Sequence, residues 1–431
     1  MANARASAIL ISAPASGQGK TTVTAVLARA AVRAGQRVRV FKTGPDFIDP
    51  MILARACGQP VYQLDLWMGG LAHCRNLLYQ AAKDCDLILV EGVMGLYDGS
   101  PSSADLARQL SLPLLIVIDG SAMAQTFGAV ALGLKAYGAD LAIHGVIANR
   151  VAGAGHAALL AESLAGPAAG ISFLGALDAD RAIELPDRHL GLVQAEEIAD
   201  LETRIDRAAQ ALAASVRIED LPQVTFHADA DLHPPPLLAG LSIAVARDAA
   251  LSFVYPANLD LLRAMGAAIR YFSPLRDAPP PADAIYLPGG YPELHAAKLA
   301  ANGALHAALR QHVEAGKPLL AECGGMMLLF EHLVDLEGRR HAMAGIFPGE
   351  TAMQPKLQAI ALQSVGLAQG ELRGHSFHHS RLQTPLAPLL HARTQRGGTG
   401  EALFRQGALT ASYIHFYFPS HPRAAAALFR P

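Results

Sequence analysis

Charged side chains are scarce in this sequence. Only 17% of its 431 residues are Asp, Glu, Lys or Arg, and the formal net charge is −2. A chain so close to neutral lacks the basic surface typical of nucleic-acid-binding proteins, so we expect no nucleic-acid partner. Long apolar runs are missing as well. Although 52% of the residues are hydrophobic, no run approaches the roughly 18 apolar residues of a membrane span, and we expect no membrane partner.

Cysteine is equally sparse. The four cysteines, Cys57, Cys74, Cys85 and Cys323, show neither C-x-x-C spacing nor the framework of a disulfide-rich domain. Their spacing therefore predicts neither a zinc site nor disulfide bonds. The first six residues lead directly into an apolar strand and leave no room for a signal peptide, so we expect a soluble, cytoplasmic protein. A chain of this length can form two or three domains, each with its own core.

Apolar runs of strand length alternate with helix-length segments through the first half of the chain. This alternation predicts an α/β domain with a mostly parallel sheet, covered by helices on both faces. Residues from about 150 to 220 continue with Ala-rich helical segments and indicate no separate chemistry. The predicted strands are Ala8–Ala13, Arg37–Phe41, Asp86–Glu91, Leu114–Asp119 and Ile143–Ala148.

A glycine-rich loop follows the first predicted strand and leads into a predicted helix from Val23 to about Ala34. Its sequence is P-A-S-G-Q-G-K-T-T, and its last residues match the end of a P-loop, although Pro14 stands where the first glycine of that motif usually lies. Backbone N–H groups would cradle phosphates, the lysine would reach the β- and γ-phosphates, and the first threonine hydroxyl would bind Mg²⁺. The predicted nucleotide-binding residues are Gly17, Gly19, Lys20, Thr21 and Thr22.

Three acidic residues follow predicted strands in this half. Asp46 and Asp49 lie in K-T-G-P-D-F-I-D-P after the second strand, and Glu91 ends the strand that begins at Asp86. Parallel sheets bind ligands at the carboxyl ends of their strands, so these carboxylates are suited to bind Mg²⁺ or to position a substrate group. For the two aspartates the alternative is a role as turn residues before Pro50.

Asn149 ends the last predicted strand of this half. In P-loop synthetases an Asn at such a position often hydrogen-bonds the adenine base. An Asn that simply terminates a strand is an equally good interpretation of the sequence.

The composition changes between residues 221 and 240, where His233 is followed by three prolines. We interpret this segment as a linker between an N-terminal domain, residues 1–220, and a second α/β domain, residues 241–431.

A strand, a turn and a helix are predicted around Cys323. The apolar run Leu319–Ala321 enters, Glu322 and Cys323 follow, and Gly324 and Gly325 precede a second apolar run, Met326–Phe330. We interpret the layout as a nucleophile elbow in which a helix N-terminus favours the thiolate. The alternative is an inert, buried structural cysteine.

Two further features fit a nucleophilic cysteine. Gly290, in P-G-G-Y-P-E at the end of the predicted strand Ala284–Leu287, would offer an N–H to an oxyanion together with Gly324. A general base is also required. The candidates are His375, His378, His379 and His415, and we favour His415 because it ends an apolar, strand-like run near the C-terminus.

The second half resembles a class I glutamine amidotransferase. Together the two halves resemble the cobyrinate and hydrogenobyrinate a,c-diamide synthases, in which a P-loop synthetase domain precedes the amidotransferase domain. The resemblance covers nearly the whole chain. The motifs that carry it are A-P-A-S-G-Q-G-K-T-T, K-T-G-P-D-F-I-D-P, V-E-G-V-M-G-L-Y-D-G, A-R-D-A-A-L-S-F-V-Y-P-A-N-L, L-P-G-G-Y-P-E, A-E-C-G-G-M-M and S-Y-I-H.

This resemblance implies a reaction. Ammonia released from glutamine at Cys323 would amidate the a and c carboxylates of a corrinoid acid, which MgATP first activates as acyl phosphates. It implies that Lys20 and Thr21 hold ATP and Mg²⁺, and that Cys323 and His415 form the glutaminase pair. It further implies that metal binding and substrate activation fall to Asp46, Asp49 and Glu91.

The same comparison leaves some points open. Most class I domains carry a Glu two residues after the histidine, where this chain has Tyr417, so the resemblance implies a Cys–His dyad and leaves open what orients His415. Cobyric acid synthases and the nickel-sirohydrochlorin a,c-diamide synthases are the nearest alternatives. A partition-type ATPase switch is an alternative of another class, but it leaves Cys323 unexplained. The sequence also leaves open the metal in the corrinoid ring, the order of amidation, the ammonia path and the oligomeric state, a homodimer included.

Overall fold

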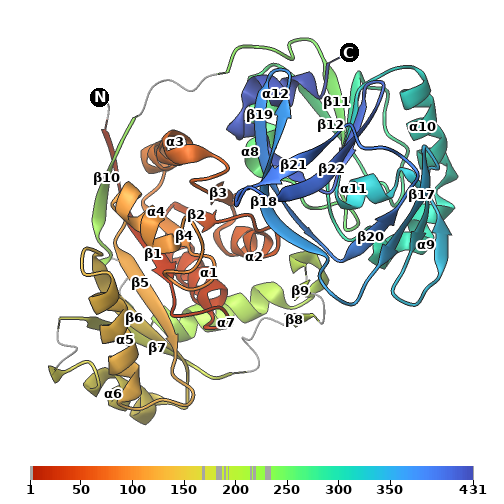
Figure 1. The fold of residues 1–431 in the computed structure, drawn as a ribbon. Coiled ribbons are helices and arrows are strands. Elements are labelled where there is room, and N and C mark those ends of the chain that lie inside the picture. The colour runs from red at the N-terminus through yellow and green to blue at the C-terminus, as the bar shows by residue number, and fades with distance from the viewer. Residues whose placement is uncertain are drawn as a thin grey trace. The chain divides into compact units, whose positions relative to one another are not determined.

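The chain forms two compact units in the computed structural model, Met1–Leu232 and His233–Pro431 (Figure 1). The structure describes residues 3–166, 170–180, 187–188, 191–192, 194–213, 216, 220–228 and 234–430. Within these residues no helix combines the length and the apolar character needed to cross a membrane.

The first unit contains a sheet whose strands run in the order β3-β2-β4-β1-β5-β6-β7, all parallel, with β10 paired antiparallel to β1. The strands are β1 (Asn3–Ser12), β2 (Val38–Thr43), β3 (Tyr62–Leu64), β4 (Leu87–Glu91), β5 (Leu114–Asp119), β6 (Ile143–Val151), β7 (Ser172–Asp178) and β10 (Gln223–His227). The predicted parallel α/β fold is confirmed. The sequence analysis missed β7, which lies in the region expected to be helical.

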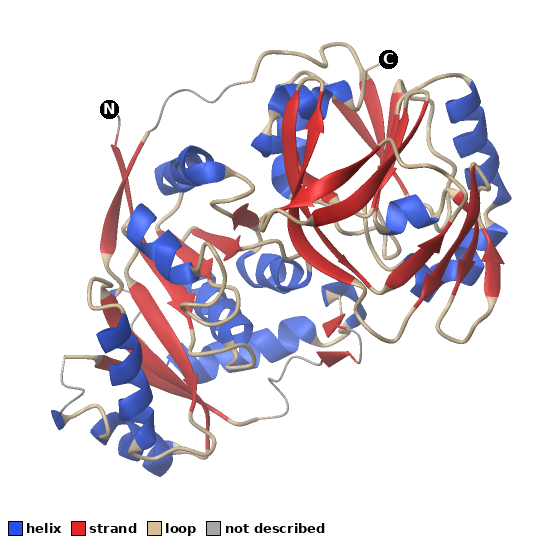
Figure 2. Ribbon diagram, in the orientation of Figure 1, coloured by secondary structure: helices blue, strands red, loops and turns tan. Residues whose placement is uncertain are grey.

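Helices cover both faces of this sheet, and each face has its own hydrophobic core (Figure 2). One core packs α3, α4, α5 and α6 against the sheet, and the other packs α1, α2 and α7. The helices are α1 (Lys20–Arg33), α2 (Ile48–Cys57), α3 (Gly70–Asp84), α4 (Ser103–Leu110), α5 (Thr126–Tyr137), α6 (Ala154–Glu162) and α7 (Leu201–Ala213). The short elements β8 (Asp187–Arg188), β9 (Gly191–Leu192) and η2 (Ala195–Glu197) complete the unit.

The start of the predicted linker, residues 221–240, needs correction. Residues Gln223–His227 form β10, which pairs with Asn3–Ser7 at the beginning of β1. The pairing satisfies backbone groups along the edge of β1, a contact that composition alone does not indicate. Residues 229–233 of the segment lie outside the described part of the chain.

The second unit contains a mixed sheet with the order β12-β11-β13-β14-β23-β22-β21-β18-β19-β24. It is parallel from β12 to β23 and antiparallel from β23 onward. Its strands are β11 (Ser242–Ala246), β12 (Ala268–Phe272), β13 (Ala284–Leu287), β14 (Leu319–Glu322), β18 (Ala359–Leu367), β19 (Gly370–His378), β21 (Leu390–Thr394), β22 (Thr399–Gln406), β23 (Leu409–Ser412) and β24 (His415–Tyr417).

A smaller sheet and short helices surround this central sheet. The smaller sheet has the order β16-β15-β17-β20. Its strands are β15 (Phe330–Val334), β16 (Arg340–Ala342), β17 (Phe347–Met353) and β20 (Ser380–Gln383). The helical elements are α8 (Pro256–Ala264), η4 (Pro292–His295), α9 (Ala296–Ala301), α10 (Gly303–Glu314), α11 (Gly324–Met327), η5 (Phe418–Ser420) and α12 (Pro422–Ala427).

The helix predicted after Cys323 is much shorter than the sequence suggested. It is the single turn α11, and Phe330 already begins β15. The apolar run Met326–Phe330 is fully buried as expected, but it is divided between a helical turn and a strand of the smaller sheet. Periodicity cannot separate these two states in so short an apolar run.

Candidate functional site

The P-loop of the first unit connects β1 to α1, as predicted. Gly17 and Gly19 have φ angles of +77° and +89°, in the left-handed region that favours glycine. At Gly19 a side chain is also excluded by space, because an added Cβ would lie 2.0 Å from Nδ2 of Asn149. The loop therefore presents its backbone at the N-terminus of α1, the arrangement that binds phosphate groups.

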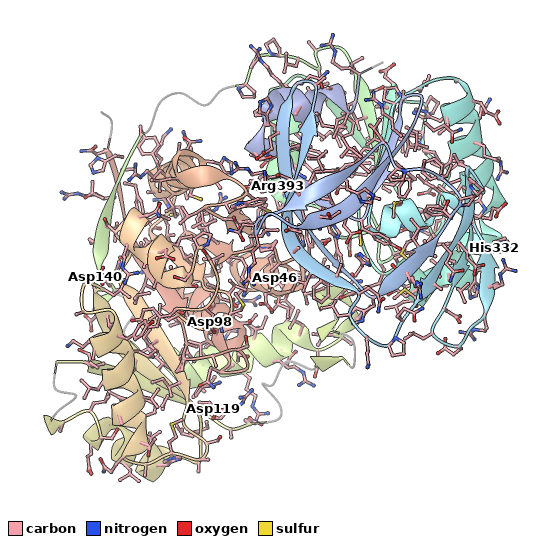
Figure 3. The ribbon with its side chains drawn as sticks, viewed as in Figure 1. Asp46, Asp98, Asp119, Asp140, His332 and Arg393 are labelled. Atoms are coloured by element: carbon pink, nitrogen blue, oxygen red, sulfur yellow. The ribbon has the colours of Figure 1, made fainter. Side chains whose placement is uncertain are left out.

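The end of β6 holds this loop in place. Asn149 donates from Nδ2 to the carbonyl oxygen of Gln18 at 2.9 Å. Arg150 donates to the carbonyl oxygen of Gly17 at 2.9 Å and to Asp119 at 2.7 Å. Asp119, at the end of β5, is labelled in Figure 3. The Asn149 amide N–H thus anchors the P-loop, while its role toward adenine stays a prediction.

Lys20, Thr21 and Thr22 form the first turn of α1. The buried ammonium group of Lys20 donates to the carbonyl oxygens of Met94 at 2.6 Å and Ala15 at 3.2 Å. Burial lowers the pKa of Lys20, and the nearby charge of Lys42 adds to this effect. The Thr21 hydroxyl donates to Glu91 at 2.8 Å, whereas Thr22 is half-buried beside it.

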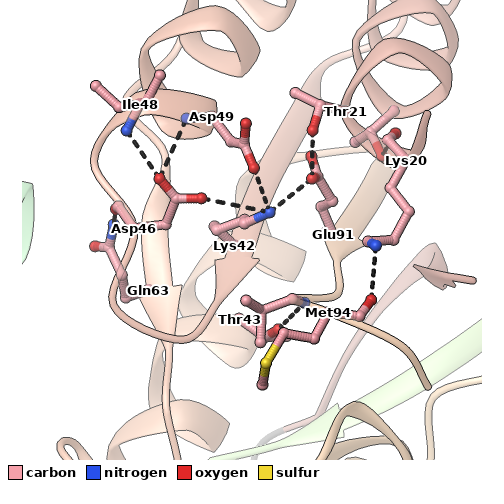
Figure 4. A network of polar contacts seen from close by, with 12 residues as sticks. Lys20, Thr21, Lys42, Thr43, Asp46, Ile48, Asp49, Gln63, Glu91 and Met94 are labelled. Atoms are coloured by element: carbon pink, nitrogen blue, oxygen red, sulfur yellow. Dashed lines mark hydrogen bonds and ion pairs between the residues drawn. The ribbon is translucent and has the colours of Figure 1, made fainter. Parts of the chain in front are cut away.

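The centre of the site is a buried lysine that the sequence analysis did not single out. Lys42, at the end of β2, places Nζ 2.6 Å from Glu91, 2.7 Å from Asp49 and 3.6 Å from Asp46 (Figure 4). Its side chain is 2% exposed. All three predicted carboxylates of this half are therefore brought together around one cation, close to the P-loop threonine Thr21.

The position of Asp46 depends on local backbone contacts as well. Its Oδ1 accepts hydrogen bonds from the N–H groups of Ile48 at 2.9 Å and Asp49 at 3.3 Å, at the start of α2. Asp46 thus acts as a turn residue and as a member of the carboxylate cluster. The two interpretations of the sequence are compatible.

Burial and mutual proximity shift the pKa values of the three carboxyl groups in different directions. Burial, together with Asp49, raises the pKa of Asp46 to about 8, against the opposing effect of Lys42. Burial would also raise the pKa of Asp49, but the ion pair with Lys42 brings it below its ordinary value. Burial raises the pKa of Glu91 despite the same lysine. Burial lowers the pKa of Lys42, but the negative charges of Glu91 and Asp49 outweigh burial, and the net effect is a raised pKa.

Two carboxylate oxygens of this cluster are buried without a hydrogen-bond partner among the described residues: Oε2 of Glu91 and Oδ1 of Asp49. Buried polar atoms are rarely left in this state unless they serve a ligand or an ion. No set of three or more His, Cys, Asp or Glu side chains in the described chain forms a protein-only metal site. Mg²⁺ needs no such site, because it commonly binds one or two carboxylates together with phosphate oxygens.

Lys42 could have been found in the sequence from its position. It ends an apolar strand, four residues before Asp46 and seven before Asp49. Lysines are almost never fully buried unless they are paired. Lys42 precedes two acids that can pair with it. The missing information was Glu91, which lies 49 residues further along the chain.

In the second unit, Cys323 occupies a strained elbow between β14 and α11. Its φ and ψ angles are +44° and −110°, a conformation that L-residues rarely adopt. Its backbone N–H donates to the carbonyl oxygen of Ser412 at 2.8 Å, continuing the parallel pairing of β14 with β23. Strained backbone at a cysteine on a tight strand–helix turn is typical of a nucleophile.

The turn Gly289–Gly290 lies between the elbow and His415. A Cβ added at Gly289 would lie 2.1 Å from Cε1 of His415, and a Cβ added at Gly324 would lie 3.0 Å from the backbone N of Gly290. Gly289 therefore contacts the imidazole, and Gly290 contacts the elbow at Gly324. The structure thus brings His415, Gly290, Gly324 and Cys323 close together, while their catalytic roles stay predictions.

The surroundings of Cys323 favour the thiol, contrary to the expectation that its helix would favour the thiolate. Burial, and next the carboxylate of Glu293, raise the pKa of Cys323, while the N–H of Gly324 lowers it only in part. The single turn of α11 supplies too short a dipole to offset burial. Burial also lowers the pKa of His415, with smaller effects from His375 and His378. The imidazole is therefore neutral and able to accept a proton.

The other candidate bases have different surroundings. His375 lies opposite His415 in the pairing of β19 with β24, and the two rings stack with centroids 4.9 Å apart. Its Nδ1 is 2.8 Å from the hydroxyl oxygen of Tyr255. His378 contacts Glu401 at 3.1 Å and stacks on the ring of Tyr413. Of these candidates, His415 is the one whose ring lies against Gly289 beside the elbow.

Known proteins share both halves of this architecture. Residues 9–193 match the family described as the CobQ/CobB/MinD/ParA nucleotide binding domain, and residues 242–423 match the CobB/CobQ-like glutamine amidotransferase domain. A protein of Stutzerimonas stutzeri named hydrogenobyrinate a,c-diamide synthase is 59% identical over 98% of both chains. Its namesake from Pseudomonas aeruginosa is 57% identical over 100% of this chain and 99% of its own. A cobyrinate a,c-diamide synthase of Herminiimonas arsenicoxydans is 51% identical, over 98% and 96% of the respective chains.

Proposed function

The chain belongs to the family of hydrogenobyrinate and cobyrinate a,c-diamide synthases, and from this premise we propose the reaction of its two sites. The protein is a ligase that uses ATP and glutamine to amidate the a and c carboxylates of hydrogenobyrinate or cobyrinate. The observation that carries the proposal is the presence, in one chain, of a P-loop beside clustered carboxylates and a Cys–His elbow. The first suits carboxylate activation and the second suits ammonia release.

The second unit would release the ammonia. Cys323 Sγ attacks the carboxamide carbon of glutamine while its proton passes to His415. The N–H groups of Gly290 and Gly324 stabilise the oxyanion. The C–N bond then breaks, the imidazolium returns the proton to the leaving nitrogen, and ammonia departs. Water hydrolyses the remaining thioester to glutamate and the free thiol. The neutral state of His415 in the buried site supports its role as the base.

The first unit would use this ammonia. A substrate carboxylate attacks the γ-phosphorus of ATP and ADP leaves, which yields an acyl phosphate. Ammonia then attacks the acyl carbon, phosphate departs and the amide remains after loss of a proton. Lys20 and Lys42 would stabilise the negative charge of the phosphoryl group. Lys20 begins the P-loop helix, and Lys42 contacts the oxygen of Glu91 that Thr21 of this helix also contacts. Asp46 and Asp49 would position the substrate carboxylate and the attacking ammonia.

Mg²⁺ fits this site together with ATP. Thr21, Asp46 and Glu91 would hold it, and the buried oxygen Oε2 of Glu91, which has no partner among the described residues, supports this assignment. The ion would neutralise phosphate charge.

Since ATP and glutamine are cytoplasmic metabolites, we place the reaction in the cytoplasm and expect neither membrane nor nucleic acid as a partner. A homodimer is compatible with this reaction.

The proposal is tested by product analysis. Purified protein receives ATP, Mg²⁺ and glutamine with hydrogenobyrinate, cobyrinate, nickel-sirohydrochlorin or their a,c-diamides, and products are weighed by mass spectrometry. We expect two successive amidations of hydrogenobyrinate or cobyrinate. Amidation restricted to the a,c-diamides would indicate a cobyric acid synthase, and amidation restricted to the nickel compound would indicate the other relative. ATP hydrolysis without any amide product would reject the ligase function.

A further inference from the structure

His415 lies on a strand whose backbone is held by buried side chains. The strand β24 pairs with β19, with Phe416 opposite Gly374. The N–H and C=O groups of Phe416 are taken up on the side away from β19: Glu322 accepts from the N–H at 3.1 Å, and Asn258 donates to the carbonyl oxygen at 2.7 Å. Such outward groups are expected in a non-hydrogen-bonded antiparallel pair. Buried side chains thus fix both the backbone N–H and the backbone C=O of Phe416, the residue after His415.

Glu322 is the residue directly before Cys323. Its Oε1 accepts from the N–H of Phe416, and its Oε2 accepts from the Tyr286 hydroxyl at 2.7 Å. Glu322 is 1% exposed, and both Tyr286 and Asn258 are fully buried. Both carboxylate oxygens of one side chain are therefore engaged, one by β24 and the other by β13. Asn258 completes the arrangement, since its Oδ1 accepts from the N–H of Phe418 at 2.8 Å.

We infer that Glu322 is a positioning residue that fixes His415 opposite Cys323. The inference rests on the proposed glutaminase chemistry. One side chain links the backbone beside the nucleophile to the backbone beside the base, so the separation of the two catalytic groups depends on it. At position 417, where most class I domains carry a Glu that orients the histidine, this chain has Tyr417. The carboxylate next to Cys323 thus orients the base through the main chain of its strand.

The hydrogen bonds, rather than the charge, carry this role. Burial raises the pKa of the Glu322 carboxyl to about 8, although the bonds from Tyr286 and Phe416 lower it. No Lys or Arg among the described residues forms an ion pair with Glu322. A glutamine can keep the acceptor oxygen for the N–H of Phe416 and can donate its amide to the tyrosine oxygen. Glu322→Ala instead leaves a buried N–H without an acceptor.

The test compares Glu322→Gln and Glu322→Ala in the full chain. Glutamate release from glutamine and amidation with ammonium chloride are measured separately. Because a displacement of about 1 Å can cost roughly 100-fold in rate, we expect Glu322→Ala to lower kcat for glutamate release by about 100-fold, with KM changed less than about threefold. Glu322→Gln should retain most of kcat, and ammonia-dependent amidation should be unchanged in both variants. Asp335→Ala is the control, because Asp335 is also a buried carboxylate bonded to backbone N–H groups, but it lies in the β15–β16 turn.

A second measurement covers the case in which Glu322→Ala does not fold. Tyr286→Phe removes one bond to Glu322 with little change in shape. It should lower kcat for glutamate release several-fold in the wild-type background and also in Glu322→Gln, because the glutamine amide bonds the same tyrosine oxygen. Wild-type rates in Glu322→Ala, equal losses in the Ala and Gln variants, or a rise in KM at constant kcat would each overturn the inference.

Another readout follows the cysteine directly. Carbamidomethylation of the Cys323 sulfur by iodoacetamide, with loss of iodide, is followed against pH by peptide mass spectrometry. The pH profile of Glu322→Ala should move to that of His415→Ala, and the profile of Glu322→Gln should stay with the wild type. A pH profile of Glu322→Ala that differs from both the wild type and His415→Ala would contradict the inference. If the wild-type protein releases glutamate but forms no corrinoid amide, the proposed function fails while this test stands.

Discussion

Nζ of Lys42 lies 2.6 Å from Oε1 of Glu91, and the same oxygen accepts a hydrogen bond from Thr21 at 2.8 Å. Oε1 of Glu91, at the end of β4, is therefore the atom at which the end of β2 and the first turn of α1 meet. Because this lysine is the ion-pair partner of all three carboxylates of the cluster, we expect the stability of the site to depend on it.

Replacing Lys42 with Met should strongly destabilise the first unit. The change leaves buried carboxylates without their cation, and removal of one partner from a buried ion pair typically costs about 3–5 kcal/mol. The loss should be smaller at pH 5 than at pH 8, since protonated carboxyl groups need no counter-ion. Urea denaturation at both pH values measures it. The exposed Lys83→Met is the control and should change little; equal stability of Lys42→Met and the wild type at pH 8 would contradict the prediction.

Asp46 should make stability depend on pH in a definite direction. Its folded pKa is about 8, above the ordinary value of 3.8, so the folded chain retains a proton that the unfolded chain loses. The stabilisation is complete below pH 4 and is lost as the pH rises through about 8. In Asp46→Asn this component should disappear, and the stability curve between pH 5 and pH 9 should be flatter than that of the wild type. The exposed Asp84→Asn should keep the wild-type slope.

The same Asp46→Asn variant should separate the two activities. Asp46 lies in the cluster of the first unit, so amidation with saturating ammonia should fall by at least about tenfold, which corresponds to the loss of one contact worth about 1.4 kcal/mol. Glutamate release should continue, because the residues proposed for it lie in the second unit. An unchanged rate of ammonia-dependent amidation would exclude Asp46 from the site.

Cys323→Ala should abolish glutamine-dependent amidation and leave ammonia-dependent amidation largely intact. The substitution removes the nucleophile but requires no new space, since the smaller side chain fits the same elbow. Product formation from each nitrogen donor is measured under saturating ATP. Equal loss with both donors would show that the cysteine is structural. Cys74→Ala, at a fully buried cysteine of the first unit, provides the control.

Gly289→Ala should inactivate glutamine hydrolysis through His415. The new Cβ would lie 2.1 Å from Cε1 of the imidazole, so the ring must move away from its position beside the elbow. We expect glutamate release to fall by about 100-fold, while ammonia-dependent amidation is unchanged. Gly303→Ala is the matched control, because no atom lies within 4 Å of the corresponding Cβ. Full glutaminase activity in Gly289→Ala would show that the ring position is not critical.

Both candidate sites could be located from local sequence. Strand length, the glycine-rich turn before Lys20 and the acid that ends β4 are features of short segments, and the parallel sheet follows from their alternation. The elbow was recognisable for the same reason, because Cys323 stands between an apolar strand and two glycines. Local patterns failed where an apolar segment could adopt two states, as in Met326–Phe330, or where a strand joined a distant edge, as in β10.

The sequence by itself determined the order of the two α/β units, the P-loop, the carboxylates after the strands and the cysteine elbow, because each depends on residues close together in the chain. Only the tertiary structure decided how these groups are charged and fixed. Lys42 meets Glu91 across 49 residues, and Glu322 meets the N–H of Phe416 across 94. The protonation states of the thiol and the imidazole also required it, since they result from burial, which the fold creates and no short segment encodes.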